Sequence, residues 1–256
     1  GDTDGLTVTT VDTTTGVTSN ASNISITAGG DDSVLTVSQA ITTGGGADTS
    51  SVTLTADKMT IGAGVTTGTN GIATLAPEST GDAGDAIDLG GADATNTLGL
   101  TDAELDLVTA TTLRIGATNA GAITVSAAVS PGSVTNLSLL SDAGIGDNLN
   151  AGSITVTNLR LDVDTAVDLS TGNDVDTLAV NVADASNALT FGDTDGLTVG
   201  VVDGTTGVTT NNAQVDLTGG ANGTLTISSA LASGGGAVNL TGDKMALTAA
   251  VNATGG

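Results

Sequence analysis

The sequence predicts an all-β fold, a right-handed parallel β-helix (β-solenoid) that forms a single elongated rod. Three observations lead to this prediction. Apolar and polar residues alternate in short segments along the chain, glycine-rich turns separate these segments, and large aromatic side chains are almost absent. Alternation with a period of two residues is typical of strands that bury one face. Short strands at roughly ten-residue spacing predict a sandwich, a barrel or a solenoid.

Apolar-polar-apolar triplets mark the expected strands, and their middle residue is often threonine, which suits a solvated strand face. In chain order, these triplets occupy residues 6–8, 24–26, 35–37, 52–54, 87–89, 113–115, 123–125, 137–139, 154–156, 178–180, 189–191, 197–199, 215–217, 225–227 and 238–240. Glycine doublets and triplets lie between many of them, at residues 29–30, 44–46, 90–91, 219–220 and 234–236. The spacing predicts strands of three to six residues.

The segment LGLTDAELDLV, residues 98–108, allows two interpretations. Thr101 and Glu104 fit the Thr-x-x-Glu capping box, which predicts a helical turn that starts near Thr101. The alternative is two short strands, at residues 98–100 and 105–107, joined by a tight turn. We favour the pair of strands.

The scarcity of aromatic residues decides between the all-β architectures. Phe191 is the single aromatic residue, so the core consists of small aliphatic side chains. Such side chains cannot fill a wide core at native packing density. An immunoglobulin-like sandwich usually carries a core Trp or Tyr, and a propeller carries a glycine or aromatic signature in each blade. A parallel solenoid of roughly ten coils, on the order of 50 Å long, fits the composition best.

The chain contains a long internal repeat. Residues 1–18 and 192–209 are identical at 15 of 18 positions, and later motifs recur with shifts that fall in turns. Length changes confined to turns are expected where each strand stacks on a neighbour. We therefore expect residues 1–191 to form one full module of a continuous solenoid and residues 192–256 to begin the next, with no true domain break.

The charge balance excludes several classes of function. The chain has 28 acidic and 4 basic residues, a net charge of −24, and neither His nor Cys. Nucleic-acid binding requires clustered Lys and Arg. Apolar runs are too short for membrane insertion. Without His and Cys, a Ser-His-Asp triad, a Cys-His pair and a typical zinc site have no candidates. We expect no enzymatic activity and no catalytic residues.

Calcium is the one metal that the sequence favours, because Ca²⁺ prefers hard oxygen ligands. The candidate ligands are pairs of Asp residues at alternate positions: Asp2 and Asp4, their repeat Asp193 and Asp195, and Asp174 with Asp176. The last pair, in GNDVDTL, resembles part of an RTX calcium-binding repeat. The competing interpretation, which we favour, is that these Asp residues form turns and keep the surface solvated.

The remaining charged residues and Phe191 are expected to have structural roles. Lys58 follows Asp57, and the two are expected to form a local pair that contributes little on an exposed surface. Arg114 and Arg160 each lie between two aliphatic strand residues, so we expect them to face solvent over neighbouring acids. Phe191 is expected to fill or cap the core.

Three segments together resemble the repeats of very large bacterial exoproteins, including filamentous-haemagglutinin-like adhesins. These segments are SVTLTADKMTIGAGV, AIDLGGADATNTLGLTDAELDLVTATTLRIGATNAGAITVSAAV and GNDVDTLAVNV. The resemblance implies a right-handed parallel β-helix, export to the cell surface or medium, and a role as a stalk, adhesin or matrix filament. The open end strands of a solenoid can pair with another copy, end to end or laterally, so we expect as partners other copies of the chain or other cell-surface components. The second hypothesis is a binding module whose exposed Thr, Asn and Asp rows contact glycans.

Overall fold

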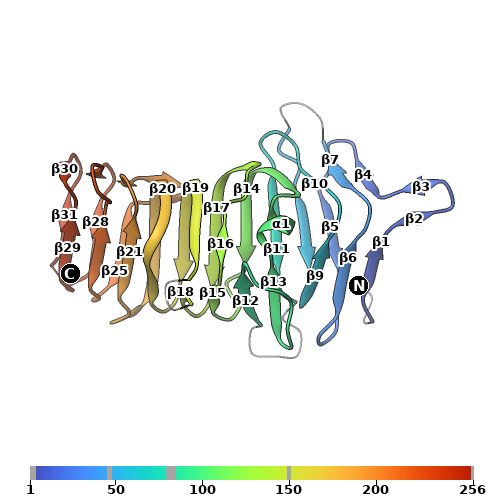
Figure 1. Ribbon diagram of the computed structural model, residues 1–256, viewed down its shortest axis with the longest axis horizontal. Helices are drawn as coiled ribbons and strands as arrows, with labels where there is room; N and C mark the ends of the chain where they lie inside the picture. The colour runs from blue at the N-terminus through green and yellow to red at the C-terminus, as the bar shows by residue number, and fades with distance from the viewer. Residues whose placement is uncertain (1–3, 45–47, 79–84, 149–150, 255–256) are drawn as a thin grey trace.

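The computed structural model describes residues 4–44, 48–78, 85–148 and 151–254, and these form a parallel β-solenoid of about 10 turns. Figure 1 shows a rod whose strands run across the long axis, with the two termini at opposite ends. Consecutive coils of a parallel solenoid stack about 4.8 Å apart, so ten coils span about 50 Å. The predicted all-β solenoid is confirmed, and its right-handed winding stays a prediction.

The first coils are built from three rows of short parallel strands. One row pairs β1 with β6 and β9, the second pairs β4 with β7 and β10, and the third pairs β5 with β8 and β11. Their bounds are β1 (Leu6–Val8), β4 (Val17–Ser19), β5 (Ile24–Thr27), β6 (Val34–Val37), β7 (Ile41–Thr43), β8 (Val52–Thr55), β9 (Lys58–Ile61), β10 (Val65–Thr66) and β11 (Ile72–Ala76).

The middle coils contain longer strands than the sequence predicts. They comprise β12 (Ala86–Leu89), β13 (Thr97–Leu100), β14 (Val108–Gly116), β15 (Ile123–Val125), β16 (Ala128–Val129), β17 (Val134–Ser141), β18 (Ile145–Asp147), β19 (Ser153–Val163), β20 (Val167–Ala185) and β21 (Leu189–Asp193). The 19 residues of β20 pair with β21 at one end and with β22 and β25 at the other, with two register irregularities. The strand therefore continues around the corners of the coil through bulges, which the triplet pattern does not reveal.

The last coils return to rows of short strands. These are β22 (Thr198–Val199), β25 (Val208–Asn211), β26 (Val215–Thr218), β27 (Thr224–Ile227), β28 (Leu231–Ala232), β29 (Val238–Thr241), β30 (Lys244–Leu247) and β31 (Val251–Asn252). Every triplet that the sequence singled out overlaps a strand. The strand β21 runs across residues 191 and 192, so backbone pairing continues from the first copy of the repeat into the second.

Two antiparallel hairpins depart from the coil and were not predicted. The first hairpin, residues 9–16, contains β2 (Thr10–Val11) and β3 (Thr14–Thr15). The second hairpin, residues 200–207, contains β23 (Val201–Val202) and β24 (Thr205–Thr206). In Figure 1 the first hairpin extends beyond the N-terminal end of the rod.

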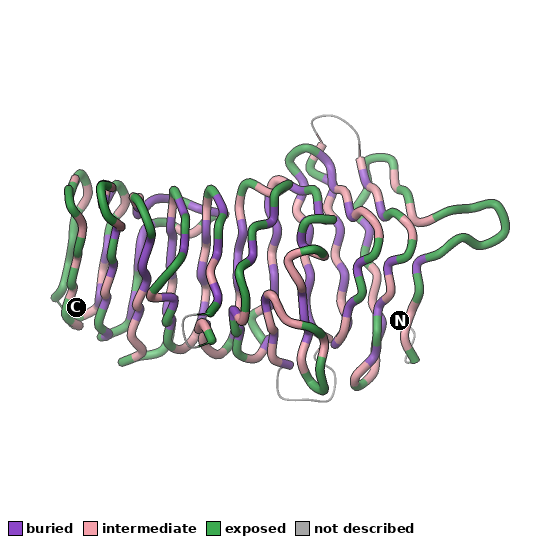
Figure 2. Tube along the Cα trace, viewed as in Figure 1, coloured by how far each residue is buried: buried purple, intermediate pink, exposed green. Residues whose placement is uncertain are grey.

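The core is a thin aliphatic stack in which like residues lie over like residues. One file runs through consecutive coils by direct register: Leu75, Ile115, Leu139, Leu161 and Val180. All five are buried. Figure 2 shows buried positions along the rod up to its last coil, where the residues are exposed or half-buried. Phe191 lies in this core, as predicted. Among the described residues, the structure holds no helix long and apolar enough to cross a bilayer.

The segment of residues 98–108 contains one strand and one helical turn, so the predicted second strand at residues 105–107 is wrong. The helix α1 spans Asp102–Leu105 and follows β13 directly. The Glu104 carboxylate accepts two hydrogen bonds from Thr101, one from the backbone amide at 3.0 Å and one from the side-chain hydroxyl at 2.7 Å. It also accepts the amide of Ile61 at 3.1 Å. The capping box, together with the burial of Leu105 in the core, stabilises the helical turn.

Candidate functional site

The structure separates the predicted calcium ligands into different environments. Asp2 lies outside the described residues, and Asp4 is exposed at the start of the first coil. Asp174 and Asp176 are exposed on β20. Asp193 is buried at the end of β21, whereas Asp195 lies in the exposed turn that follows. Within the described part of the chain, no three Asp or Glu side chains gather closely enough to hold a metal ion.

Asp193 is bound by backbone amides. The amides of Val175, Asp195 and Gly196 donate to its carboxylate at 2.8, 3.2 and 3.0 Å. Asn173, its register partner one coil earlier, accepts the amide of Ile154 at 3.0 Å in the same manner. The two side chains form a short ladder that connects one coil to the preceding one. Asp193 therefore has a structural role, the binding of backbone amides, and one coil earlier the uncharged side chain of Asn173 has the same role.

Burial raises the pKa of Asp193 to about 6. The charge of Asp195 acts in the same direction, whereas the amide donors act against it. The pKa is raised above its ordinary value of 3.8, so the stabilising contribution of Asp193 is fully present below that value and is lost as pH rises through about 6. At neutral pH the ionised carboxylate is therefore less favourable in the folded chain than the protonated form would be.

We expect Asp193→Asn to weaken the pH dependence of stability between about pH 4 and pH 6, the interval between the ordinary value of 3.8 and the folded pKa of about 6. The wild-type chain should lose stability over this interval because the unfolded chain releases the Asp193 proton while the folded chain still holds it, and the variant should lose less. Urea denaturation at several pH values measures the slope. Asp176→Asn removes an equal charge from an exposed position and serves as the control. Equal slopes for Asp193→Asn and the wild type would contradict the prediction.

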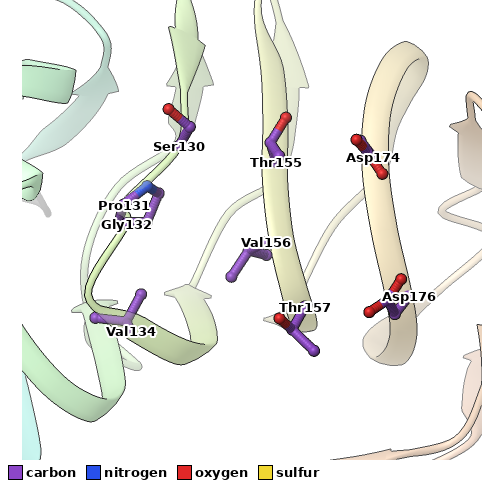
Figure 3. Close-up of a pocket in the computed structure, with 9 residues that line it drawn as sticks. All are labelled: Ser130, Pro131, Gly132, Val134, Thr155, Val156, Thr157, Asp174 and Asp176. Atoms are coloured by element: carbon purple, nitrogen blue, oxygen red, sulfur yellow. The ribbon is translucent and has the colours of Figure 1, made fainter.

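Asp174 and Asp176 line an open groove of about 330 Å³ on the outer surface. The hydroxyl groups of Ser130, Thr155 and Thr157 line the same groove. Figure 3 shows these side chains on three neighbouring segments, with the two carboxylates on one edge. Carboxylates and hydroxyls together are suited to a hydrated cation or to a molecule rich in hydroxyl groups.

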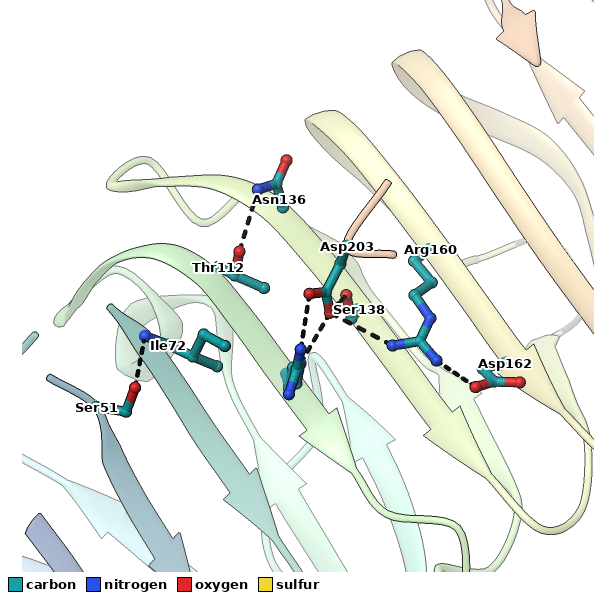
Figure 4. A network of polar contacts seen from close by, with 9 residues as sticks. Ser51, Ile72, Thr112, Asn136, Ser138, Arg160, Asp162 and Asp203 are labelled. Carbon is teal, nitrogen blue, oxygen red and sulfur yellow. Dashed lines mark hydrogen bonds and ion pairs between the residues drawn. The ribbon is translucent and has the colours of Figure 1, made fainter. Parts of the chain in front are cut away.

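A side-chain network lies on the outer face of β14, β17 and β19. The carboxylate of Asp203, in the second hairpin, accepts hydrogen bonds from Nε and Nη2 of Arg114 at 2.8 and 2.7 Å. It also accepts a hydrogen bond from Oγ of Ser138 at 2.7 Å. Nη1 of Arg160 lies 3.4 Å from the same carboxylate, and Nη2 of Arg160 pairs with Asp162. Figure 4 shows Asp203 beside Ser138 and Arg160, with Arg160 also directed toward Asp162. The network fastens the second hairpin to three earlier coils.

The arginines hold Asp203 in its ionised form. Burial alone would raise the pKa of Asp203, but the hydrogen bonds from Arg114 and Ser138 and the charges of both arginines outweigh it. The pKa of Asp203 therefore lies below its ordinary value. The hydrogen bonds that Arg114 donates to Asp203 in turn raise the pKa of Arg114. This is an electrostatic contact between residues 89 positions apart in sequence.

The predictions for the charged residues are therefore partly wrong. Arg160 does pair with a neighbouring acid, Asp162, but both arginines are partly covered by a hairpin from a distant segment. Lys58 pairs with Asp32 at 2.8 Å in place of the expected Asp57. The Asp57 carboxylate points inward and accepts the amide of Asp32 at 2.7 Å.

The sequence prediction missed Asp203, although a local signal was present. Asp203 and Gly204 lie between Val201-Val202 and Thr205-Thr206, and Asp-Gly between strand-forming residues is a common two-residue hairpin turn. The structure gives both turn residues positive φ, 44° and 85°. The partners of Asp203 could not be read from this pattern.

Comparison with protein-family models, with curated proteins and with solved structures finds no match to this chain. A functional proposal therefore rests on the fold, the side-chain geometry and the resemblance of the sequence segments.

Proposed function

We propose that this chain is a non-enzymatic structural repeat of a secreted or cell-surface bacterial protein, in which a stiff solenoid serves as a stalk or as part of an extracellular filament or adhesin. The observation that carries the proposal is the aliphatic stack, which continues without a break through about 10 turns. Parallel strands with one shared core resist bending because every coil packs on its two neighbours.

The ends of the rod support extension by further coils. Met245, Leu247 and Val251 in the last coil are exposed. Their counterparts in the first copy, Met59, Ile61 and Val65, are buried. An exposed strand edge with apolar side chains is a template for pairing with another chain segment. The net charge of −24 opposes side-by-side packing of rods, so we favour end-to-end contacts between copies.

The resemblance to filamentous-haemagglutinin-like adhesins supplies the rest of the proposal. It supports an extracellular or cell-surface location and partners that include other copies of the chain and other cell-surface components. An alternative function is a glycan-binding or Ca²⁺-binding adhesion module. The groove that brings Asp174, Asp176, Ser130, Thr155 and Thr157 together favours this alternative.

Electron microscopy of the purified chain, with and without a calcium chelator, tests both proposals. We expect straight rods of constant width whose length the chelator does not change, because the coils are held by aliphatic packing and backbone hydrogen bonds. Compact particles would contradict the stalk or filament. Rods that collapse in the chelator would favour the calcium-binding alternative. A glycan array with Asp174→Asn and Asp176→Asn as controls tests the groove.

A further inference from the structure

The first hairpin repeats the second hairpin in sequence and in strand pairing. Residues 9–16 correspond to residues 200–207, and five of the eight positions are identical. Thr10 pairs with Thr15 as Val201 pairs with Thr206. Asp12 has φ of 55° where Asp203 has 44°. The hairpin therefore forms in both copies of the repeat, whether or not a coil lies beneath it.

The two hairpins differ in what they contact. The second hairpin folds back over the outer face of β19 and β20, where Val202 is 2% exposed and Asp203 meets Arg114, Ser138 and Arg160. In the first hairpin, Val11, the counterpart of Val202, is 71% exposed. Figure 2 shows the first hairpin as an exposed projection beyond the end of the rod.

The first hairpin and the first coil form an apolar groove of about 340 Å³. Its apolar lining consists of Leu6, Val8, Val11, Val17 and Ile26. The counterparts of these residues in the second copy are all buried: Leu197, Val199, Val202, Val208 and Leu217. The structure thus contains an example of the same groove with its occupant in place.

The occupant in the second copy is the preceding coil. The strand β20 pairs with β22 and β25, so Leu178 lies beside Val199, and Val180 lies beside Val208. The strand β21 pairs with β26 and places Phe191 beside Leu217. These strands supply both backbone partners and apolar cover. Among the described residues, β1, β4 and β5 pair only with strands of the following coil, so their other edge has neither.

We propose that the N-terminal end of this chain is a docking surface for a preceding copy of the same module, and that the first hairpin closes over the outer face of that copy with Asp12 between its Arg114 and Arg160. The register follows from the second copy: Leu178, Val180 and Phe191 of the preceding copy lie beside Val8, Val17 and Ile26. The proposal rests on the proposed rod and specifies how one module joins the next.

The sequence differences between the hairpins permit this contact. Thr9 takes the position of Gly200. A Cβ added at Gly200 would lie 2.6 Å from the Cγ2 methyl of Thr177, so the Thr177 side chain would have to rotate. Thr13 takes the position of Gly204, where an added Cβ would have no heavy atom within 4 Å. Gly204 has φ of 85° and Thr13 has no positive φ, so the two turns differ at this residue. Thr10 replaces Val201, and both are exposed.

Cysteine labelling of a duplicated chain tests the proposal. Residues 1–191 are placed directly before the full chain, so the junction repeats the natural sequence of residues 191–199 letter for letter. The chain has no cysteine, so Val11→Cys in the second segment introduces a single thiol. We expect this thiol to react with a maleimide at least about tenfold more slowly than Val11→Cys in the single chain, because docking must open first.

Two further variants calibrate the measurement. Val202→Cys in the single chain gives the rate for a docked hairpin, and Thr10→Cys, on the exposed face, should react quickly in both chains. Equal rates for Val11→Cys in the single and duplicated chains would overturn the proposal, as would an equal slowing of Thr10→Cys. If labelling of Val11→Cys in the single chain is slow and depends on protein concentration, separate molecules bind to this surface. That result would overturn the proposed contact between tandem modules. Electron microscopy of the duplicated chain tests the proposed rod separately from the proposed docking. Lengthened rods together with fast labelling of Val11→Cys would support the rod and reject the docking.

Discussion

Asp203→Ala should destabilise the middle coils of the rod by about 2 kcal/mol, because it leaves Arg114 and Arg160 partly buried without their shared carboxylate. The value is reduced from that of a fully buried pair because Arg114 keeps some contact with solvent. Urea denaturation measures the total loss. Amide hydrogen exchange in residues 200–207 should rise most, because the network fastens the second hairpin to the rod.

Asp12→Ala is the matched control for Asp203→Ala. It removes the same side chain from the same hairpin turn, at a position where the hairpin projects from the rod. We expect a change within about 0.5 kcal/mol. Because the pKa of Asp203 lies below its ordinary value of 3.8, its contribution is present above that pH and is lost as pH falls through the folded value. The difference between the two variants should therefore shrink in acid, and equal losses at neutral pH would contradict the assigned role of the network.

Met59→Ala should lower the free energy of unfolding by about 3 kcal/mol, which is within the usual range for truncating a large aliphatic side chain in a packed core. Met59 is 1% exposed beneath the following coil. Met245 occupies the same Asp-Lys-Met motif in the second copy but is 47% exposed in the last coil. Met245→Ala should therefore lower the free energy of unfolding by about 0.5 kcal/mol or less. Thermal or urea denaturation of both variants compares one side chain with and without a coil above it.

Equal losses from Met59→Ala and Met245→Ala would contradict this prediction, because they would require the end coil to be as well packed as an internal one. Amide exchange provides a second readout. Exchange in residues 58–61 should rise in Met59→Ala, whereas residues 244–247 should exchange readily even in the wild type, as expected for a terminal coil.

The strands and the core could be predicted because they depend on local pattern. Each triplet such as Leu137-Ser138-Leu139 places two side chains on one face, and a parallel stack buries that face whatever precedes it in sequence. The repeat of residues 1–18 was also recognised from the sequence, and in the structure both of its copies form the same hairpin, which was not predicted. The helical turn at Asp102–Leu105 was predicted less well, because Thr101 and Glu104 compete with a strand pattern over few residues.

The candidate sites could be predicted only in part. The pair Asp174 and Asp176 was identified from spacing and does line a groove. Asp193 and Asp195 look equivalent to that pair in sequence, yet Asp193 is buried and binds amides. Its burial depends on β21 ending at this residue over the preceding coil, which the spacing of two carboxylates does not specify.

The thin, aliphatic, parallel solenoid follows from the sequence alone, because strand alternation and small apolar side chains admit few other cores. The contacts of Asp203 with Arg114, Ser138 and Arg160 became visible in three dimensions, as did the exposure of the equivalent hairpin at residues 9–16. A strand or a hairpin turn is encoded within a few residues, whereas a contact between coils depends on the summed lengths of every strand and turn between them.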